Sequence, residues 1–194
     1  MTDYPEEHDM SDVLAAATGT WVIDPAHTRL GFSVRHAMVT TVRGQFDQFE
    51  GSLVLDGEDP AKSAATVTIQ TASIATGSDD RDNHLRSPDF FDADTYPTLT
   101  FVASDVVAHN DEDFEMTGAL TIHGVSRPVT IKAEYQGLVN DPFGNERIGF
   151  AGETQINRKD FGLNWNAALE AGGVLVGEKV KIHLDVAAVK VKQA

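Results

Sequence analysis

Residues 129–136 read Val129-Thr130-Ile131-Lys132-Ala133-Glu134-Tyr135-Gln136, with apolar and polar side chains in strict alternation. Successive side chains of a β-strand point to opposite faces, so this segment has one apolar and one polar face. Residues 180–186 (Val-Lys-Ile-His-Leu-Asp-Val) repeat the pattern. Strands buried on one face only are typical of antiparallel sheets.

Alternation of this kind recurs about eight times, at residues 29–35, 43–55, 66–70, 98–103, 114–123, 129–136, 147–156 and 179–186. Turn signals such as Asn140-Asp141-Pro142 separate the segments. In the second segment the alternation shifts between Phe46 and Phe49, which predicts a β-bulge. We predict an all-β chain that closes into an eight-stranded antiparallel β-barrel, although a two-sheet sandwich fits the same alternation nearly as well.

Residues 76–97 interrupt the alternation. Ser78 is suited to cap a helix, acidic residues follow it in the first turn, and Pro88 would end the helix near Ser87. A long connection in a compact β-protein often covers an opening. We therefore predict a short helical lid near residues 79–87, across one end of the barrel.

The composition excludes several classes of function. The chain has 30 acidic and 15 basic residues, and its net charge of −15 argues against nucleic acid as a partner. It has no cysteine, which rules out disulfides and thiolate metal sites. The histidines show no metal-ligand spacing, so we predict no metal, no cofactor and no catalytic constellation. No apolar run approaches the ~20 residues of a membrane span.

The first 19 residues form a separate region of the sequence. They are acidic, and no lysine or arginine precedes Arg29. The apolar run from Val13 to Ala17 is short for a signal peptide. We predict a disordered tail over residues 1–19, a single domain over residues 20–194 and a cytoplasmic location. The alternative is a short helix over residues 11–17 that packs on the domain.

The apolar faces of the strands supply candidate lumen residues, which are Phe32, Val34, Phe46, Phe101, Leu120, Ile122, Ile131 and Ile182. Small residues on the same faces would leave room for a ligand, namely Ala103, Gly118, Ala133, Gly152 and Ala188. An apolar chain gains ~25 cal/mol per Å² of surface buried there. The alternative is a lumen filled by its own side chains.

Candidate polar contacts at the barrel mouth are His36, Arg81 and His84, which could meet the polar headgroup of a ligand in the lumen. Each has a second interpretation: His36 as a solvent-exposed strand end, and Arg81 as a local ion-pair partner. Arg158 has the same ambiguity. Asp24 and His27 are spaced either as an acid–base pair or, as we favour, for a hydrogen bond at the start of a strand.

Several motifs, taken in order, resemble the YceI-like family. They include Trp21-Val22-Ile23-Asp24-Pro25-Ala26-His27, Arg81-Asp82-Asn83-His84-Leu85, Asp89-Phe90-Phe91-Asp92, Gly118-Ala119-Leu120-Thr121-Ile122-His123-Gly124 and Asn157-Arg158-Lys159-Asp160-Phe161-Gly162. The resemblance implies a bacterial, lipocalin-like barrel whose apolar lumen binds polyisoprenoid chains. Family members are often exported, and this sequence departs from them in lacking a convincing signal peptide.

Three functions follow from these observations. The leading one is binding or carriage of a long-chain isoprenoid-type lipid. The alternatives are an enzyme acting on a hydrophobic substrate inside the barrel, and a filled barrel that serves as an interaction module. The sequence leaves a homodimer open as an assembly.

Overall fold

The computed structural model describes residues 15–110 and 112–192. The strands are β1 Gly19–Ile23, β2 Arg29–His36, β3 Thr40–Phe46, β4 Phe49–Leu55, β5 Ala64–Gln70, β6 Ile74–Ala75, β7 Thr98–Ala108, β8 Asp113–Ile122, β9 Val125–Asn140, β10 Glu146–Asn157 and β11 Val176–Lys190. Helix α2 spans Asp79–Arg86, and short 3-10 turns are η1 Pro25–His27, η2 Pro60–Lys62, η3 Thr71–Ser73 and η4 Arg158–Phe161.

The strands form a closed antiparallel barrel. Hydrogen bonding follows the order β1-β4-β5-β7-β8-β9-β10-β11, and β11 pairs back onto β1. This ring has eight strand positions, as the sequence predicted, and its closure rules out the two-sheet sandwich. The predicted helix is also present, as α2, and ends at Arg86 with Ser87 as its C-cap.

The extra strands arise because three of the eight positions are interrupted. η1 separates β1 from β2, and η3 separates β5 from β6. Between β3 and β4 the break falls at Asp47 and Gln48, whose N–H groups donate to the carbonyl and hydroxyl oxygens of Ser73. The alternation shift expected from a β-bulge between Phe46 and Phe49 is therefore a strand break.

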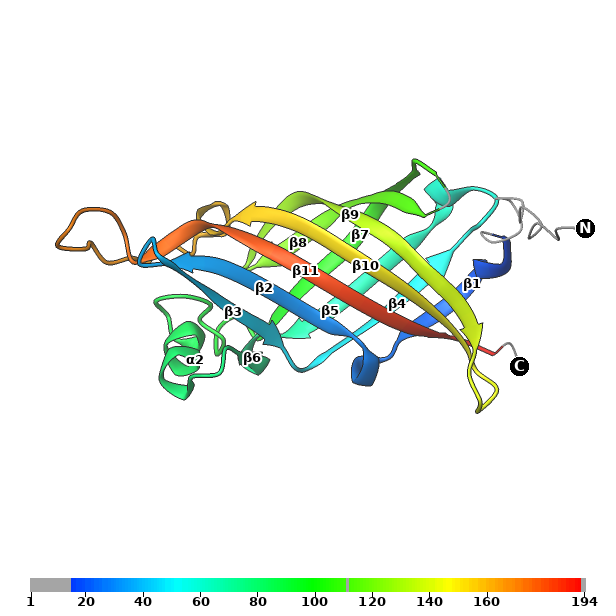
Figure 1. Cartoon of the computed structure of the whole chain (residues 1–194), viewed down its shortest axis with the longest axis horizontal. Coiled ribbons are helices and arrows are strands. Elements are labelled where there is room, and N and C mark those ends of the chain that lie inside the picture. Colours follow the sequence, from blue (N-terminus) through cyan, green and yellow to red (C-terminus); the bar gives the residue numbers. More distant parts are fainter. Residues whose placement is uncertain (1–14, 111, 193–194) are drawn as a thin grey trace, which may run out of the picture.

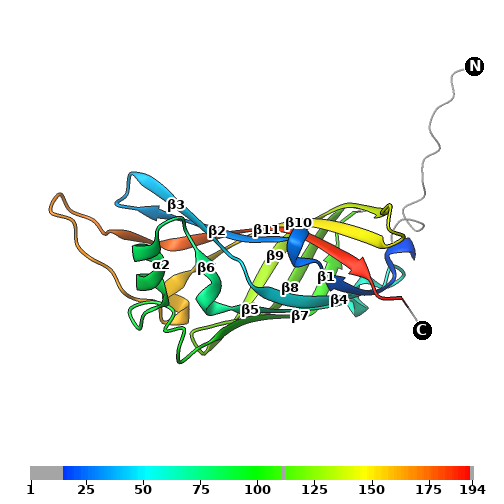
Figure 2. The ribbon, with the colours of Figure 1, turned by 90° about the horizontal axis from the view of Figure 1, so that it is seen from below.

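The barrel is elongated, and its two ends differ (Figure 1). At one end, the α2 end, lie α2, the β2–β3 turn and the connection from β10 to β11. At the other, the termini end, lie the start of β1, the end of β11, the β4–β5 loop and the β9–β10 turn. Figure 2 shows α2 beside β6 at the α2 end. Arg86 joins the two by donating to the carbonyl oxygens of Ala72 and Ile74.

Much of the barrel interior is filled by side chains. Trp21, Ile148 and Ala188 are fully buried, and Phe101, Leu120, Ile122 and Ile131 belong to the same core. Gly118 lies against this core, because a Cβ there would be 2.7 Å from Cζ of Phe101 and 2.8 Å from Cα of Ala103. The expectation that Gly118 leaves room for a ligand is therefore wrong.

The N-terminal region predicted as a tail falls largely outside the described residues, since residues 1–14 are not among them. Residues 15–17 form a helical turn, and Ala17 is buried. The indole Nε1 of Trp21 donates to the carbonyl oxygen of Ala17 at 2.9 Å. This turn therefore packs on the barrel.

Candidate functional site: an apolar cavity at the termini end

The termini end of the barrel contains a cavity of about 130 Å³. Its walls are hydrocarbon from seven strands, β4, β5 and β7 to β11, and include Ile131, Ala133, Phe150, Leu184, Val106, Phe114 and Met116. The β4–β5 loop, residues 56–63, forms its rim with Asp56, Gly57, Pro60 and Ser63. A hydrocarbon-lined space of roughly 150 Å³ stays dry and accepts a molecule as large as benzene, so this cavity can hold an apolar group of similar size.

Two small residues lie side by side in the cavity wall. Gly152 of β10 is in register with Ala133 of β9, and both line the cavity. A Cβ on Gly152 would lie 3.3 Å from Cγ2 of Ile131 and 3.4 Å from Cδ1 of Leu184, which leaves little spare room at that point of the wall. Of the five small residues named from the sequence, Ala133 and Gly152 line the cavity, whereas Ala103 and Ala188 are packed in the core.

The predicted lumen residues lie along the whole barrel. Ile131 lines the cavity, Phe101, Leu120 and Ile122 belong to the packed core, and Ile182 packs against it. Phe32 and Val34 are on β2 toward the α2 end. There Phe32 stacks on Phe46 with ring centroids 5.9 Å apart, and Phe46 contacts Phe91 at 6.0 Å.

The sequence did not single out Tyr135, Phe150, Leu184 or Asp56 as site residues, although they line the cavity. The first three share the apolar faces that predicted the lumen. The sequence could not show which part of the barrel interior stays hollow.

The predicted mouth residues lie at the α2 end, away from the cavity lining. The guanidinium of Arg81 donates to the hydroxyl and carbonyl oxygens of Thr76. His84 forms a 2.8 Å contact with Asp89 and stacks edge-on against Trp165 at 4.7 Å. His36 is half-buried at the end of β2, in register with Thr40 of β3.

Arg158 is only 4% exposed. It is therefore neither a surface ion-pair partner nor accessible to a ligand. Its guanidinium donates to four main-chain carbonyl oxygens, those of Leu163, Trp165, Val176 and Gly177. Burial lowers the pKa of Arg158 from its usual value. The residue therefore anchors the β10–β11 connection at the α2 end.

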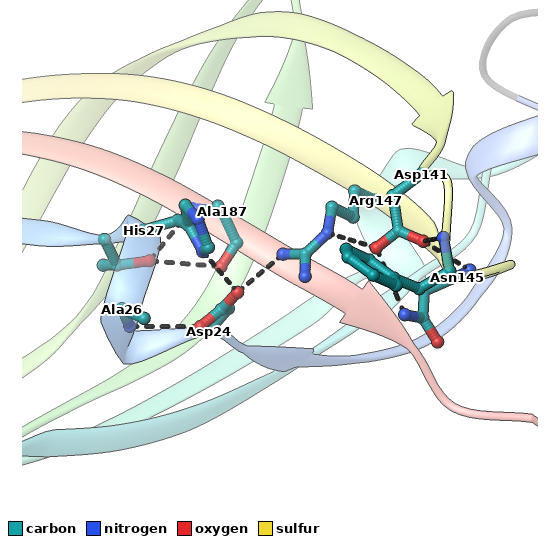
Figure 3. A network of polar contacts seen from close by, with 9 residues as sticks. Asp24, Ala26, His27, Asp141, Asn145, Arg147 and Ala187 are labelled. Carbon is teal, nitrogen blue, oxygen red and sulfur yellow. Dashed lines mark hydrogen bonds and ion pairs between the residues drawn. The ribbon is translucent and has the colours of Figure 1, made fainter.

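Asp24 and His27 belong to a polar network on the outside of the barrel (Figure 3). The Asp24 carboxylate accepts from Arg147 at 2.6 Å, from His27 at 2.7 Å and from the N–H of Ala26 at 3.0 Å. Arg147 is the chief reason why the pKa of Asp24 lies below its ordinary value. Asp24 thus holds the connection between β1 and β2 by hydrogen bonds. This agrees with the interpretation of Asp24 and His27 as a hydrogen-bonded pair at the start of a strand.

The remaining histidines are dispersed. His123 stacks on Tyr96 with centroids 4.5 Å apart, and His183 faces outward beside Ser33. Among the described residues, no three His, Asp or Glu side chains gather as a metal site would require. Within the same part of the chain, no helix has the length and apolar character needed to cross a bilayer.

Together, the closed eight-stranded antiparallel ring and the apolar cavity at one end define a lipocalin-like β-barrel protein. Residues 21–188 match the model of the YceI-like domain. The chain belongs to the YceI-like family.

Known relatives agree with this assignment. A UPF0312 protein of Vibrio cholerae is 39% identical over 156 residues, which cover 79% of this chain and 82% of that protein. The crystal structure of a Campylobacter jejuni YCEI protein is 32% identical, with a TM-score of 0.70 over 87% of this chain and 96% of that one. A polyisoprenoid binding domain from Saccharophagus degradans has the same fold, with 18% identity and a TM-score of 0.67 over 88% of this chain and 98% of that one.

Proposed function

We propose that the protein binds an isoprenoid-type lipid, whose chain enters the barrel at the termini end and lies in the apolar cavity. The observation that carries this proposal is the hydrocarbon lining of a cavity that ends at a loop-built rim. Burial of each CH₂ group contributes about 0.8 kcal/mol, so one five-carbon isoprene unit contributes roughly 4 kcal/mol.

The size of the cavity limits what enters without rearrangement. At about 130 Å³ it takes a group of about the size of one or two isoprene units. A longer chain requires side chains of the packed core to move apart, and Ile131 and Leu184 contact both the cavity and that core. The name of the Saccharophagus degradans domain supports an isoprenoid as the class of ligand.

The lining favours binding over catalysis. Among the residues that form it, Asp56 and Tyr135 carry titratable groups, and the others are apolar or small apart from Ser63. An acid–base reaction needs a positioned proton donor or acceptor at the reacting bond. Binding of a hydrocarbon chain needs no such donor or acceptor, because the apolar wall supplies the affinity.

The test is mass spectrometry of an organic extract of the purified protein. We expect an isoprenoid-type lipid that co-purifies in near-stoichiometric amount and that can be returned to the delipidated protein. If delipidated protein fails to bind isoprenoid alcohols of any chain length, the proposed function is wrong. If the returned lipid is recovered in a chemically altered form, the protein is an enzyme that acts on the lipid and not a binding protein.

A further inference from the structure

Two segments project from the barrel at the α2 end and carry almost no charge (Figure 1). They are the β2–β3 turn, residues 37–39, and the middle of the β10–β11 connection, residues 167–175, and we call them together the apolar tip. Glu170 is the one charged residue in the two segments. Val39 is 75% exposed, Met38 61% and Val174 42%.

The β2–β3 turn holds apolar residues in an unfavourable backbone conformation. Ala37 and Met38 have positive φ, 48° and 61°, a region that glycine and asparagine adopt more easily. Met38 also requires glycine at position 173, because a Cβ there would collide with its Sδ. Backbone strain of this kind is often retained where a function needs the side chain at that place.

Main-chain hydrogen bonds join the two segments of the tip. The N–H of Ala37 donates to the carbonyl oxygen of Leu175 at 2.7 Å. The N–H of Leu175 donates to Ala167 at 2.9 Å, and that of Leu169 donates to Gly173 at 3.2 Å. A polar group that is already hydrogen-bonded costs less free energy to remove from water. The tip is therefore suited to leave water for an apolar layer.

The hairpin behind the tip is basic, although the chain is acidic overall. Residues 25–46 contain no Asp or Glu but include Arg29, Arg35 and Arg43, and all three arginines are exposed. Arg35 lies beside the tip, because it donates to the carbonyl oxygen of Met38 at 2.9 Å. The acidic helix α2 lies nearer to the barrel than the β10–β11 connection does (Figure 2). Since salt screens charges beyond about 10 Å, a surface at the tip meets this local charge more than the net charge of the chain.

We propose that the apolar tip docks the protein on an anionic lipid surface. Met38, Val39 and Val174 enter the headgroup layer, and Arg35 and Arg43 lie beside the lipid phosphates. Apolar side chains backed by cations are typical of peripheral membrane anchors. A second copy that met the tip about a two-fold axis would instead bring the same arginines together. The inference goes beyond the cavity, which lies at the termini end.

The test is co-sedimentation of the protein with vesicles of phosphatidylcholine alone or mixed with an equal part of phosphatidylglycerol. We expect binding to the mixed vesicles that weakens as salt rises. Replacing both Met38→Asn and Val39→Ser should weaken it at least about tenfold, because apolar area is lost, and asparagine tolerates the positive φ at position 38. Arg43→Gln should weaken it about fivefold. Phe143→Ser and Lys192→Gln are the matched controls at the termini end and should leave binding unchanged.

A fluorescent label gives a second readout, because the chain has no cysteine of its own. Val39→Cys and Phe143→Cys each create one site for an environment-sensitive dye. Mixed vesicles should shift the emission to the blue at position 39 and leave it unchanged at position 143. Ala133→Phe, which places a ring in the cavity, should dock as the parent does, so that loss of docking and loss of cavity binding are distinguished.

Three results would overturn the docking proposal while leaving the cavity untouched. The first is a parent protein that binds neither kind of vesicle. The second is an equal loss of binding in Phe143→Ser and in the tip variant. The third is a parent that sediments as a dimer without vesicles and a tip variant that sediments as a monomer, which would show that a second copy covers the tip.

Discussion

Arg147 and Asp24 are 123 residues apart in the sequence, yet the Nη1 of Arg147 lies 2.6 Å from Oδ2 of Asp24. The Nε of the same guanidinium lies 2.7 Å from Oδ2 of Asp141 in the β9–β10 turn. One arginine thus joins the break between β1 and β2 to the turn at the termini end of the barrel. The pair lies at the same end of the barrel as the cavity, although none of the three residues lines it.

Replacing the arginine should therefore loosen this end. We expect Arg147→Met to lower the midpoint of thermal unfolding by a few degrees and to weaken lipid binding, since both carboxylates lose their shared partner. The measurements are thermal unfolding of delipidated protein and a lipid titration. Arg127→Met, at an exposed arginine of β9, is the control and should change neither.

The same network predicts how stability depends on pH. The pKa of Asp24 and that of Asp141 both lie below their ordinary value of 3.8, Asp24 chiefly through Arg147 and Asp141 chiefly through the N–H of Asn145. A carboxyl whose pKa is lower in the folded state stabilises the fold above its ordinary pKa and loses that effect as pH falls through the folded value. Denaturant unfolding should show stability falling below about pH 4, and more steeply in the parent than in Arg147→Met. Parallel curves would contradict the role of Arg147.

Arg158 should be intolerant even of lysine. Its guanidinium donates to four carbonyl oxygens, whereas an ammonium has three donors at one point and cannot span them. We expect Arg158→Lys to cost about 2–3 kcal/mol of unfolding free energy, because buried carbonyls lose their donors. Denaturant unfolding measures this. A cost no larger than that of Arg127→Lys, at an exposed arginine, would show that the carbonyls are satisfied in another way.

Substitutions at Ala133, which lines the cavity, and at Gly118, which packs against the core, distinguish the hollow part of the barrel from the filled part. Ala133→Phe places a ring in the cavity, so we expect it to reduce co-purified lipid while changing the stability of the delipidated protein by less than ~1 kcal/mol. Gly118→Ala should instead destabilise by ~1–3 kcal/mol, because its Cβ meets the core. Lipid content by mass spectrometry and denaturant unfolding give both readouts. Ala119→Phe, on the outer face of β8, is the control for added bulk, and equal lipid loss there would count against the cavity.

The N-terminal turn gives a further test. Removing residues 1–14 should leave stability nearly unchanged, as the sequence predicts for an acidic tail. Removing residues 1–17 should cost a further ~1–2 kcal/mol, because the buried Trp21 indole loses its acceptor on Ala17. Comparing the two truncations by chemical unfolding isolates residues 15–17. Equal stability of the two proteins would mean that the contact contributes nothing.

Much of the fold was predictable because each strand alternates with a period of two over enough residues to establish it. The helix was predictable as well, since Ser78 and Pro88 bracket Asp79–Arg86. The breaks within the strands could not be predicted from the sequence. The break at Asp47 and Gln48 depends on hydrogen bonds to Ser73, a partner 25 residues away that local pattern does not reveal.

The candidate site was less predictable than the fold. Alternation identifies the inner face of each strand, but whether that face is hollow depends on which residues meet across the barrel. Gly118 and Gly152 look alike in sequence, yet Gly118 is packed against Phe101 whereas Gly152 lies beside Ala133 in the cavity wall. For the same reason the sequence did not show that the candidate headgroup contacts lie at the α2 end and the cavity lies at the other.

The most direct test of the account is photo-crosslinking with an isoprenoid alcohol that carries a diazirine at the far end of its chain, followed by peptide mass spectrometry. We predict labels on cavity residues of β9, β10 and β11, such as Ala133, Phe150 and Leu184, and we predict that geranylgeraniol competes them away. Labels concentrated on Phe32, Phe46 and Phe91 at the α2 end, or labels that no competitor removes, would contradict the claim that the lipid occupies the cavity at the termini end.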